Sequence, residues 1–229
     1  MSLLNQLLSE ARKAEIGFGI HKNCVITSAT NDIRKSKEGE VIKRNCYTKF
    51  EILGEDGKST AEKEISWYNI DPTSDYAFNS FFSQLEQMTA IVDVLVPATG
   101  KKDVWSDVFD EILEKYEVEL DVEDAEGSKS ALEVAMKDKE TFVGIMDDLI
   151  ESYVEIVGKK CGLKSAPMKL KVVFDPKGRY LQQPKFDAFV ESMEISDEDS
   201  RLKITKTDEE YKAKSLETAK KPARNVGKL

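Results

Sequence analysis

The segment from residue 41 to 53 alternates between apolar and polar side chains, and it constrains the fold more than any other part of the chain. Apart from Arg44, one parity holds Ile42, Cys46, Thr48, Phe50 and Ile52. The other parity holds Lys43, Asn45, Tyr47 and Lys49. A period of two with one apolar side predicts a strand in a half-buried antiparallel sheet. Cations and an aromatic ring on the opposite face are typical of a sheet that binds single-stranded nucleic acid.

Strand-like runs at about 20–30 and 60–70 flank this segment. The Gly-Glu-Asp-Gly sequence at 54–57 predicts the turn that leads into the third strand. The connector at 31–40 is long and polar, and it carries the cations Arg34, Lys35 and Lys37. A connector of this kind is either disordered or closes over a ligand.

Trp67 and Tyr68 are adjacent in the third run, so their rings point to opposite faces of the sheet. The shared parity of Ile65 favours Trp67 on the inside, whereas Lys63 on the same parity favours the reverse. The sequence therefore leaves open which of the two rings faces a ligand.

An acidic helical block follows at about 73–157. The spacing of apolar residues predicts helices after residues 73–75, at 103–116 and at 130–157. Residues 103–155 hold 18 acidic and 4 basic side chains, a net charge of -14, against -9 for the whole chain. Nucleic-acid-binding domains are usually basic, so we expect this block to stand away from a phosphate backbone.

The chain returns to strand character at 167–183. A strand at 167–174 is followed by an Asp-Pro-Lys-Gly turn and a short return strand. Residues 157–190 hold 8 basic and 2 acidic side chains, a net charge of +6. The chain ends are polar: residues 2–15 predict a short amphipathic helix, and the basic segment from about 212 is expected to be disordered.

Three strands, a helical connector and a closing hairpin predict an α+β fold: an oligonucleotide-binding (OB) type five-stranded antiparallel β-barrel with a large helical insertion between the third and fourth strands. The domain would span 1–192, with the insertion at about 73–157, and 193–229 would form a polar C-terminal segment.

Several stretches resemble phage-type single-stranded DNA-binding proteins. They are KNCVITSA at 22–29, ISWYNID at 65–71, the helix that follows it, and LKVVFDPKGRYLQQPKFDAFVES at 170–192. The resemblance covers about 20–95 and 155–192. It implies binding of single-stranded DNA without strong sequence preference, in replication or recombination, in the cytoplasm (the host cytoplasm if the chain is phage-encoded).

The expected DNA-binding residues are cations and rings on the strands, the first connector and the hairpin. They are Arg34, Lys35, Lys37, Lys43, Tyr47, Lys49, Trp67, Tyr68, Lys169, Lys171, Lys177, Arg179 and Tyr180. Many proteins of the resembled type end in an acidic tail that recruits replication partners, whereas this chain ends in the basic KAKSLETAKKPARNVGKL. The acidic helical insert, or the acidic stretch at 195–199, is therefore the candidate docking surface for replication or recombination proteins.

No enzyme is predicted. His21 is the only histidine, and the sequence holds neither a G-x-x-x-x-G-K-[ST] loop nor a G-x-G-x-x-G motif after a strand. The 3 cysteines lack a C-x-x-C spacing, which argues against a zinc site and favours a reducing compartment. No cofactor, metal or membrane span is expected.

Two other functions remain open. The chain could be a structural or assembly protein of a virion that makes mainly protein contacts, a reading that the -14 block supports. It could also be a non-catalytic replication or recombination accessory factor that contacts DNA weakly.

Overall fold

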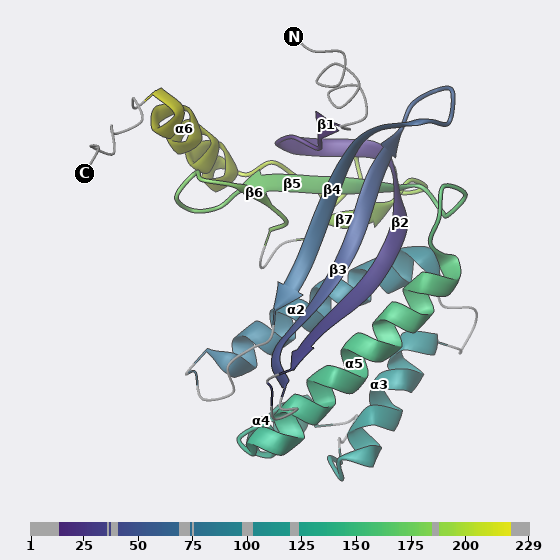
Figure 1. Ribbon diagram of the computed structural model, residues 1–229, viewed down its shortest axis with the longest axis vertical. Coiled ribbons are helices and arrows are strands. Elements are labelled where there is room, and N and C mark those ends of the chain that lie inside the picture. Colours follow the sequence, from purple (N-terminus) through teal and green to yellow (C-terminus); the bar gives the residue numbers. More distant parts are fainter. Residues whose placement is uncertain are drawn as a thin grey trace. The chain divides into compact units, whose positions relative to one another are not determined.

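In a computed structural model of the chain, the structure describes residues 14–35, 37, 41–68, 74, 76–97, 103–119, 124–184 and 188–220. The described strands are β1 (Ala14–Glu15), β2 (Gly19–Lys35), β3 (Val41–Leu53), β4 (Ser59–Tyr68), β5 (Met168–Phe174), β6 (Leu181–Gln182) and β7 (Val190–Ser192). The described helices are α2 (Ala77–Leu95), α3 (Val104–Lys115), α4 (Ala125–Ala135), α5 (Lys139–Lys160) and α6 (Lys206–Lys220). Strands β3 and β4 lie close to where the sequence predicts them (Figure 1), whereas β2 extends to Lys35, so the first half of the predicted connector at 31–40 is strand.

The described strands form an open sheet in the order β1-β4-β3-β2-β5-β6, with β7 also paired to β5. The predicted closed five-stranded OB barrel with a helical insertion is therefore wrong, and the fold is a mixed α/β arrangement. Closure would require the last strand to pair with β4. Instead β7 pairs with β5, and the edge of β4 is bordered by β1, where Ala14 lies opposite Ala61.

The chain divides into two compact units. Unit 1 comprises Met1–Cys24, Ile52–Glu62 and Pro167–Leu229, and unit 2 comprises Val25–Glu51 and Lys63–Ala166. Strands β2, β3 and β4 each contribute residues to both units. Helix α6, which lies in the segment predicted as a separate C-terminal region, belongs to unit 1.

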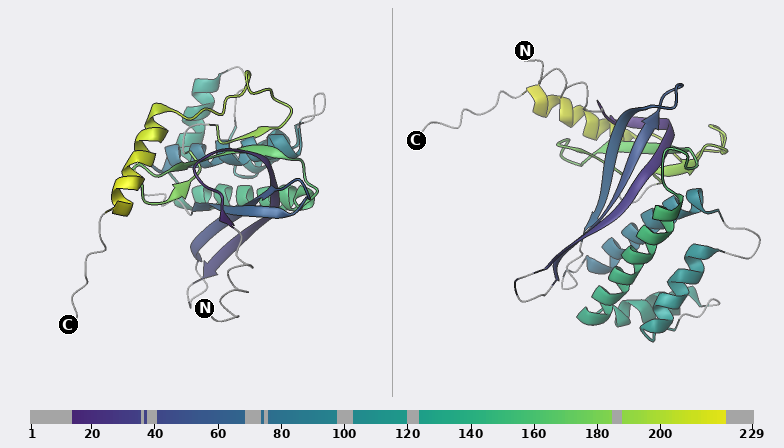
Figure 2. Two further views of the ribbon diagram at one scale, coloured as in Figure 1. Left: turned by 90° about the horizontal axis from the view of Figure 1, so that it is seen from above. Right: turned by 45° about the vertical axis from the view of Figure 1, so that its right-hand side comes forward.

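The core of unit 2 forms between its strand segments and its helices, which lie along one face of those segments (Figures 1 and 2). Thr48 and Phe50 of β3 are buried, as their parity predicts. The Thr48 hydroxyl hydrogen-bonds the Tyr153 hydroxyl of α5 at 2.8 Å. Trp67 is also buried, and its Nε1 donates to Gln87 Oε1 of α2 at 2.8 Å. Trp67 is thus the inward-facing ring of the Trp67–Tyr68 pair.

The helices of unit 2 begin at aspartate caps. Asp103 accepts hydrogen bonds from the amides of the first turn of α3, and Asp124 and Asp138 do the same for α4 and α5. The single helix predicted at 130–157 is therefore two helices, because the cap at Asp138 starts a new one. Trp105 of α3 donates to Thr89 Oγ1 at 2.8 Å, so α3 is part of the unit 2 core and not a separable appendage.

Strand β5 is the centre of unit 1. It pairs antiparallel with β2, β6 and β7, and every residue from Met168 to Val173 is buried. Helix α6 packs against β5. Thr205 and Asp208 form a reciprocal cap at its start: Thr205 N donates to Asp208 Oδ2 and Asp208 N donates to Thr205 Oγ1. The disorder expected from about residue 212 is thus replaced by helix as far as Lys220.

The N-terminal helix predicted at 2–15 lies outside the described residues, except that Ala14 and Glu15 form β1. Among the described helices, none combines the length and apolar character needed to cross a lipid bilayer.

Candidate nucleic-acid interface

The buried carboxylate of Asp175 fixes the turn between β5 and β6. Its Oδ1 accepts the backbone amides of Arg179 and Tyr180, and its Oδ2 accepts Arg179 Nε at 3.0 Å. Burial would raise the pKa of Asp175, but the hydrogen bonds from Arg179 and Tyr180 outweigh it and hold that pKa below its ordinary value. The carboxylate is therefore ionised near neutral pH and holds Arg179 in position.

The same turn presents a ring and cations to solvent. The Tyr180 side chain is 53% exposed, and the Arg179 guanidinium carbon lies 5.3 Å from its ring centre. Lys177 is exposed in the turn. Exposed rings stack on bases and cations attract phosphates. The structure therefore brings together three of the predicted site residues: Lys177, Arg179 and Tyr180.

Helix α6 lies beside this turn (Figures 1 and 2). A Cβ added to Gly178 would lie 2.5 Å from the Ser215 backbone nitrogen, so the two backbones are in direct contact. Lys214 Nζ donates to the Pro176 carbonyl at 3.3 Å. We define the hairpin–helix surface as Lys177, Arg179, Tyr180, Tyr211, Lys212 and Lys214.

We predict that Gly178→Ala loosens α6 from the turn. Gly178 has φ +67, where a side chain costs about 1–2 kcal/mol, and its Cβ would also collide with α6. Gly57→Ala is the matched control, since Gly57 has φ +74 but no atom within 4 Å of an added Cβ. Urea denaturation should show Gly178→Ala to be less stable than Gly57→Ala by roughly 1–3 kcal/mol. Equal losses in the two variants would mean that α6 does not contact the turn in solution.

Sequence reasoning missed the contribution of α6, because the composition of the C-terminal segment suggested disorder. Lys212 Nζ lies 4.6 Å from the Phe18 ring centre, and Phe18 stacks on Phe174 with ring centres 6.0 Å apart. The signal that could have identified the helix is Thr205-x-x-Asp208, a capping pattern just before residues with helix-forming side chains.

Lys169 and Lys171, both predicted to bind DNA, are buried in ion pairs. Lys169 Nζ donates to the Ile195 carbonyl at 2.7 Å and to Asp197 Oδ1 at 3.1 Å. Lys171 Nζ lies 2.8 Å from Asp208 Oδ2. Since both ammonium groups already have carboxylate partners inside unit 1, neither belongs to the candidate interface.

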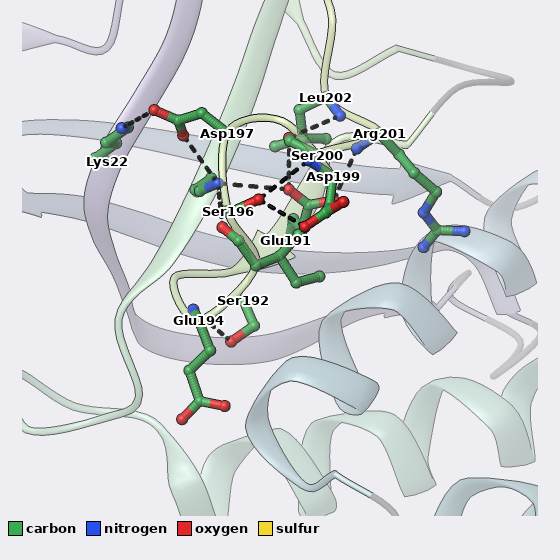
Figure 3. Close-up of polar contacts among 12 residues, drawn as sticks. Lys22, Glu191, Ser192, Glu194, Ser196, Asp197, Asp199, Ser200, Arg201 and Leu202 are labelled. Carbon is green, nitrogen blue, oxygen red and sulfur yellow. Dashed lines mark hydrogen bonds and ion pairs between the residues drawn. The ribbon is translucent and has the colours of Figure 1, made fainter.

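The segment that covers Lys169 is held by its own polar network (Figure 3). Glu191 accepts Ser200 Oγ at 2.6 Å and the Arg201 amide at 2.9 Å. Asp197 pairs with Lys22 as well as with Lys169, and hydrogen bonds from these two lysines lower its pKa. Of the three acidic side chains at 195–199, Asp197 is thus already compensated within unit 1.

The strand face predicted to bind DNA in unit 2 carries a partly compensated charge. Tyr47 and Lys49 are half-buried, on the side of β3 opposite Thr48 and Phe50. Lys49 Nζ lies 3.7 Å from the Glu51 carboxylate, which also accepts Thr27 Oγ1 at 3.1 Å. This face offers a ring, but less uncompensated positive charge than the hairpin–helix surface.

The remaining residues that the sequence predicts to bind DNA are not part of the hairpin–helix surface. Lys37 is exposed, whereas Trp67 is buried and cannot stack on a base without unpacking unit 2. The side chains of Arg34, Lys35, Lys43 and Tyr68 lie outside what the structure describes.

Asn45 of β3 has a polar side chain in a buried position. It is 1% exposed, and neither its amide nitrogen nor its oxygen has a hydrogen-bond partner among the described residues. A buried unsatisfied group costs about 1–3 kcal/mol, so Asn45→Val should stabilise the chain by roughly that amount. Thr48→Val is the matched control and should destabilise it, because it leaves the Tyr153 hydroxyl without its partner. Thermal unfolding measures both; a destabilised Asn45→Val would mean that the amide has a partner in solution.

A metal site finds no support in the described part of the chain, and two of its three cysteines are buried. No group of three or more His, Cys, Asp or Glu side chains there could hold a metal ion. Burial raises the pKa of the Cys24 and Cys46 thiols to about 12, which leaves them protonated and unreactive.

Comparison with known proteins identifies no relative of this chain. No protein-family model matches it, and no curated protein or solved structure is significantly similar to it.

Proposed function

We propose that this chain binds single-stranded DNA without strong sequence preference, in replication or recombination, and that the hairpin–helix surface of unit 1 is its principal interface. The observation that carries the proposal is the exposed ring of Tyr180 with the Arg179 guanidinium 5.3 Å from its centre. A ring and a cation held side by side match the two parts of a nucleotide, a base face and a phosphate.

The turn is organised before any ligand arrives. Asp175 holds the backbone of Arg179 and Tyr180 and also the Arg179 guanidinium. A fixed surface loses less conformational entropy on binding than a flexible one, which favours affinity. Because every base has a flat face, such a surface would tolerate any sequence.

Tyr47 and Lys49 of unit 2 are proposed as a separate, weaker contact site for single-stranded DNA. Their contribution should be mainly stacking on Tyr47, since Lys49 already lies near Glu51. Phosphate attraction at this face is correspondingly weaker.

We predict that Tyr180→Ala weakens binding to fluorescein-labelled oligo-dT by roughly 1–3 kcal/mol, the usual loss for one stacked base. Tyr180→Phe keeps the ring and should bind like the wild type. Tyr76→Ala is the control, because Tyr76 is an exposed tyrosine of unit 2 that is not among the proposed contacts. Fluorescence anisotropy gives the three affinities. Loss of binding in Tyr180→Phe equal to that in Tyr180→Ala would exclude stacking as the reason.

A second candidate function is a structural or assembly protein, and the exposed acidic side of α3 favours it. Asp107, Asp110, Glu111 and Glu114 are all exposed on this helix. Such a surface repels phosphates and is suited to contacts with other proteins. In a DNA-binding chain, the same surface would dock replication or recombination proteins. If the chain fails to bind oligo-dT, the assembly function becomes the better reading.

A further inference from the structure

Helix α6 carries a second ring–cation pair of the same kind as the one on the turn. Lys214 Nζ lies 5.0 Å from the centre of the Tyr211 ring. Residues three apart on a helix share a face, so this pairing is set by the helix itself. Tyr211 is partly accessible and Lys214 is exposed.

The docking of α6 places this pair at the turn. Lys214 reaches the Pro176 carbonyl, which precedes Lys177 in the turn, and Ser215 lies directly against Gly178. Both ends of the contact are fixed: the turn by Asp175, and α6 by the Lys171–Asp208 ion pair and the Thr205 cap. The two ring–cation pairs therefore belong to one rigid surface.

The cations of this surface are only partly paired with carboxylates. Arg179 forms an ion pair with Asp175, and Lys212 forms one with Glu209. The Asp208 carboxylate forms its ion pair with Lys171. Lys177 has no ion pair with another described residue. The accessible rings of Tyr180 and Tyr211 favour a nucleotide chain over an acidic protein segment, because bases offer flat faces to stack on.

We propose that α6 is the second half of the nucleic-acid site: Tyr211 stacks on the base next to the one on Tyr180, and Lys214 binds its phosphate. The proposal rests on the proposed function and extends it to a segment that sequence reasoning had placed outside the site. Its ligand is a pair of adjacent unpaired nucleotides of one strand. A duplex keeps its base faces stacked inside and cannot use both rings.

The first test is acetylation of lysines in the wild-type chain, with and without bound oligo-dT, read by mass spectrometry. Lys177 and Lys214 should both be protected by the oligonucleotide. Lys203, an exposed lysine before α6, is the control and should react equally in both states. Protection of Lys177 without protection of Lys214 would overturn the proposal for α6 while leaving the proposed function intact.

The second test measures affinity. Tyr211→Leu should weaken oligo-dT binding by roughly 5–150-fold, the equivalent of one stacked base, and Tyr211→Phe should not. Lys214→Gln should lower the slope of log K against log salt by about 0.7, the value for one phosphate contact on a single strand. Lys203→Gln removes the same charge and should change neither quantity.

These outcomes separate the two proposals. If wild-type protein does not bind oligo-dT at all, the proposed function fails, and the inference about α6 fails with it. If the wild type binds and Tyr180→Ala weakens binding, but Tyr211→Leu and Lys214→Gln match Lys203→Gln, the inference about α6 alone is wrong. Circular dichroism of each variant must retain the helical signal; if Tyr211→Leu loses it, the acetylation result decides.

Discussion

Lys171→Ala should lower the free energy of unfolding by about 3–5 kcal/mol, the usual effect of removing one partner of a buried ion pair. Lys171 is 1% exposed and Asp208 is 6% exposed. Without the ammonium group, the Asp208 carboxylate remains buried with no compensating charge. Since Asp208 also accepts the Thr205 amide at the start of α6, the loss should appear as release of that helix. Urea denaturation gives the free energy, and limited proteolysis within 206–220 reports the release.

Removing both charges should recover most of this stability. The double variant Lys171→Met with Asp208→Asn replaces the pair by uncharged groups of similar size, and such replacements are often close to neutral. Lys206→Gln, at an exposed lysine of the same helix, serves as the control for a simple loss of charge. A Lys171→Ala variant within about 0.5 kcal/mol of the wild type would show that the pair is not buried in solution.

The ion pair also predicts that the pH dependence of stability differs between the wild type and Lys171→Met. Burial would raise the pKa of Asp208, but Lys171 and Thr205 outweigh it and lower that pKa from its ordinary 3.8. The contribution of Asp208 to wild-type stability is therefore complete above about pH 4 and is lost as the pH falls through the lowered value. In Lys171→Met the hydrogen bonds from Thr205 remain but the ammonium group is lost, so burial weighs more heavily against the charged carboxylate. This variant should therefore lose less stability than the wild type as the pH falls through 4.

Phe50→Ala should lower the free energy of unfolding by about 3–5 kcal/mol through the cavity that it leaves. Phe50 is 0% exposed and lies on the side of β3 that packs under the helices of unit 2. The buried core of unit 2 also holds Trp67 and Tyr153, whose rings contact edge to face at 5.4 Å between centres. A core that contains such large packed rings relaxes only partly around a lost phenyl group.

Tyr47→Ala is the matched variant on the other side of the same strand. Because Tyr47 is only half-buried, its removal should change stability little and instead weaken oligo-dT binding by roughly 1–3 kcal/mol. Chemical denaturation and anisotropy titration of both variants separate the two faces. A Tyr47 variant that unfolds while the Phe50 variant stays folded would invert the assignment of the strand faces.

The strands and their inner faces could be predicted from the sequence because a period of two is a local signal. Thr48 and Phe50 are buried as their parity requires, and β3 has the predicted bounds. Asn45, on the parity predicted to face outward, is buried as well. The pairing of strands is not local. Nothing in residues 190–192 distinguishes pairing with β5 from pairing with β4, and this choice decides between the open sheet and the predicted barrel.

Lys169 and Lys171 show a second limit of sequence reasoning. They alternate with Leu170 and Val172, so the pattern correctly puts the lysines on one face and the aliphatic residues on the other. It does not say whether the lysine face meets water. In the structure, acidic side chains from distant parts of the chain, including Asp197 and Asp208, cover that face.

The hairpin could be predicted because its geometry depends only on residues that are close together in the sequence. Asp175, Gly178 and the residues between them form a turn whose geometry is set within a few residues, and the exposure of Tyr180 follows from it. The neighbouring helix was missed because a polar composition suggested disorder, although docking on β5 needs only a few buried contacts. Local signals thus located half of the candidate site, and tertiary contacts supply the other half.

The most direct test of the account is the salt dependence of oligo-dT binding by the wild-type chain, measured by fluorescence anisotropy. If phosphates contact about three or four cations of the hairpin–helix surface, log K should fall against log salt with a slope of about -2 to -3. Affinity should then drop roughly 20–50-fold between about 50 and 200 mM salt, and a duplex of equal length should bind more weakly than oligo-dT. No binding to oligo-dT at low salt, or an affinity that does not change with salt, would contradict the central claim.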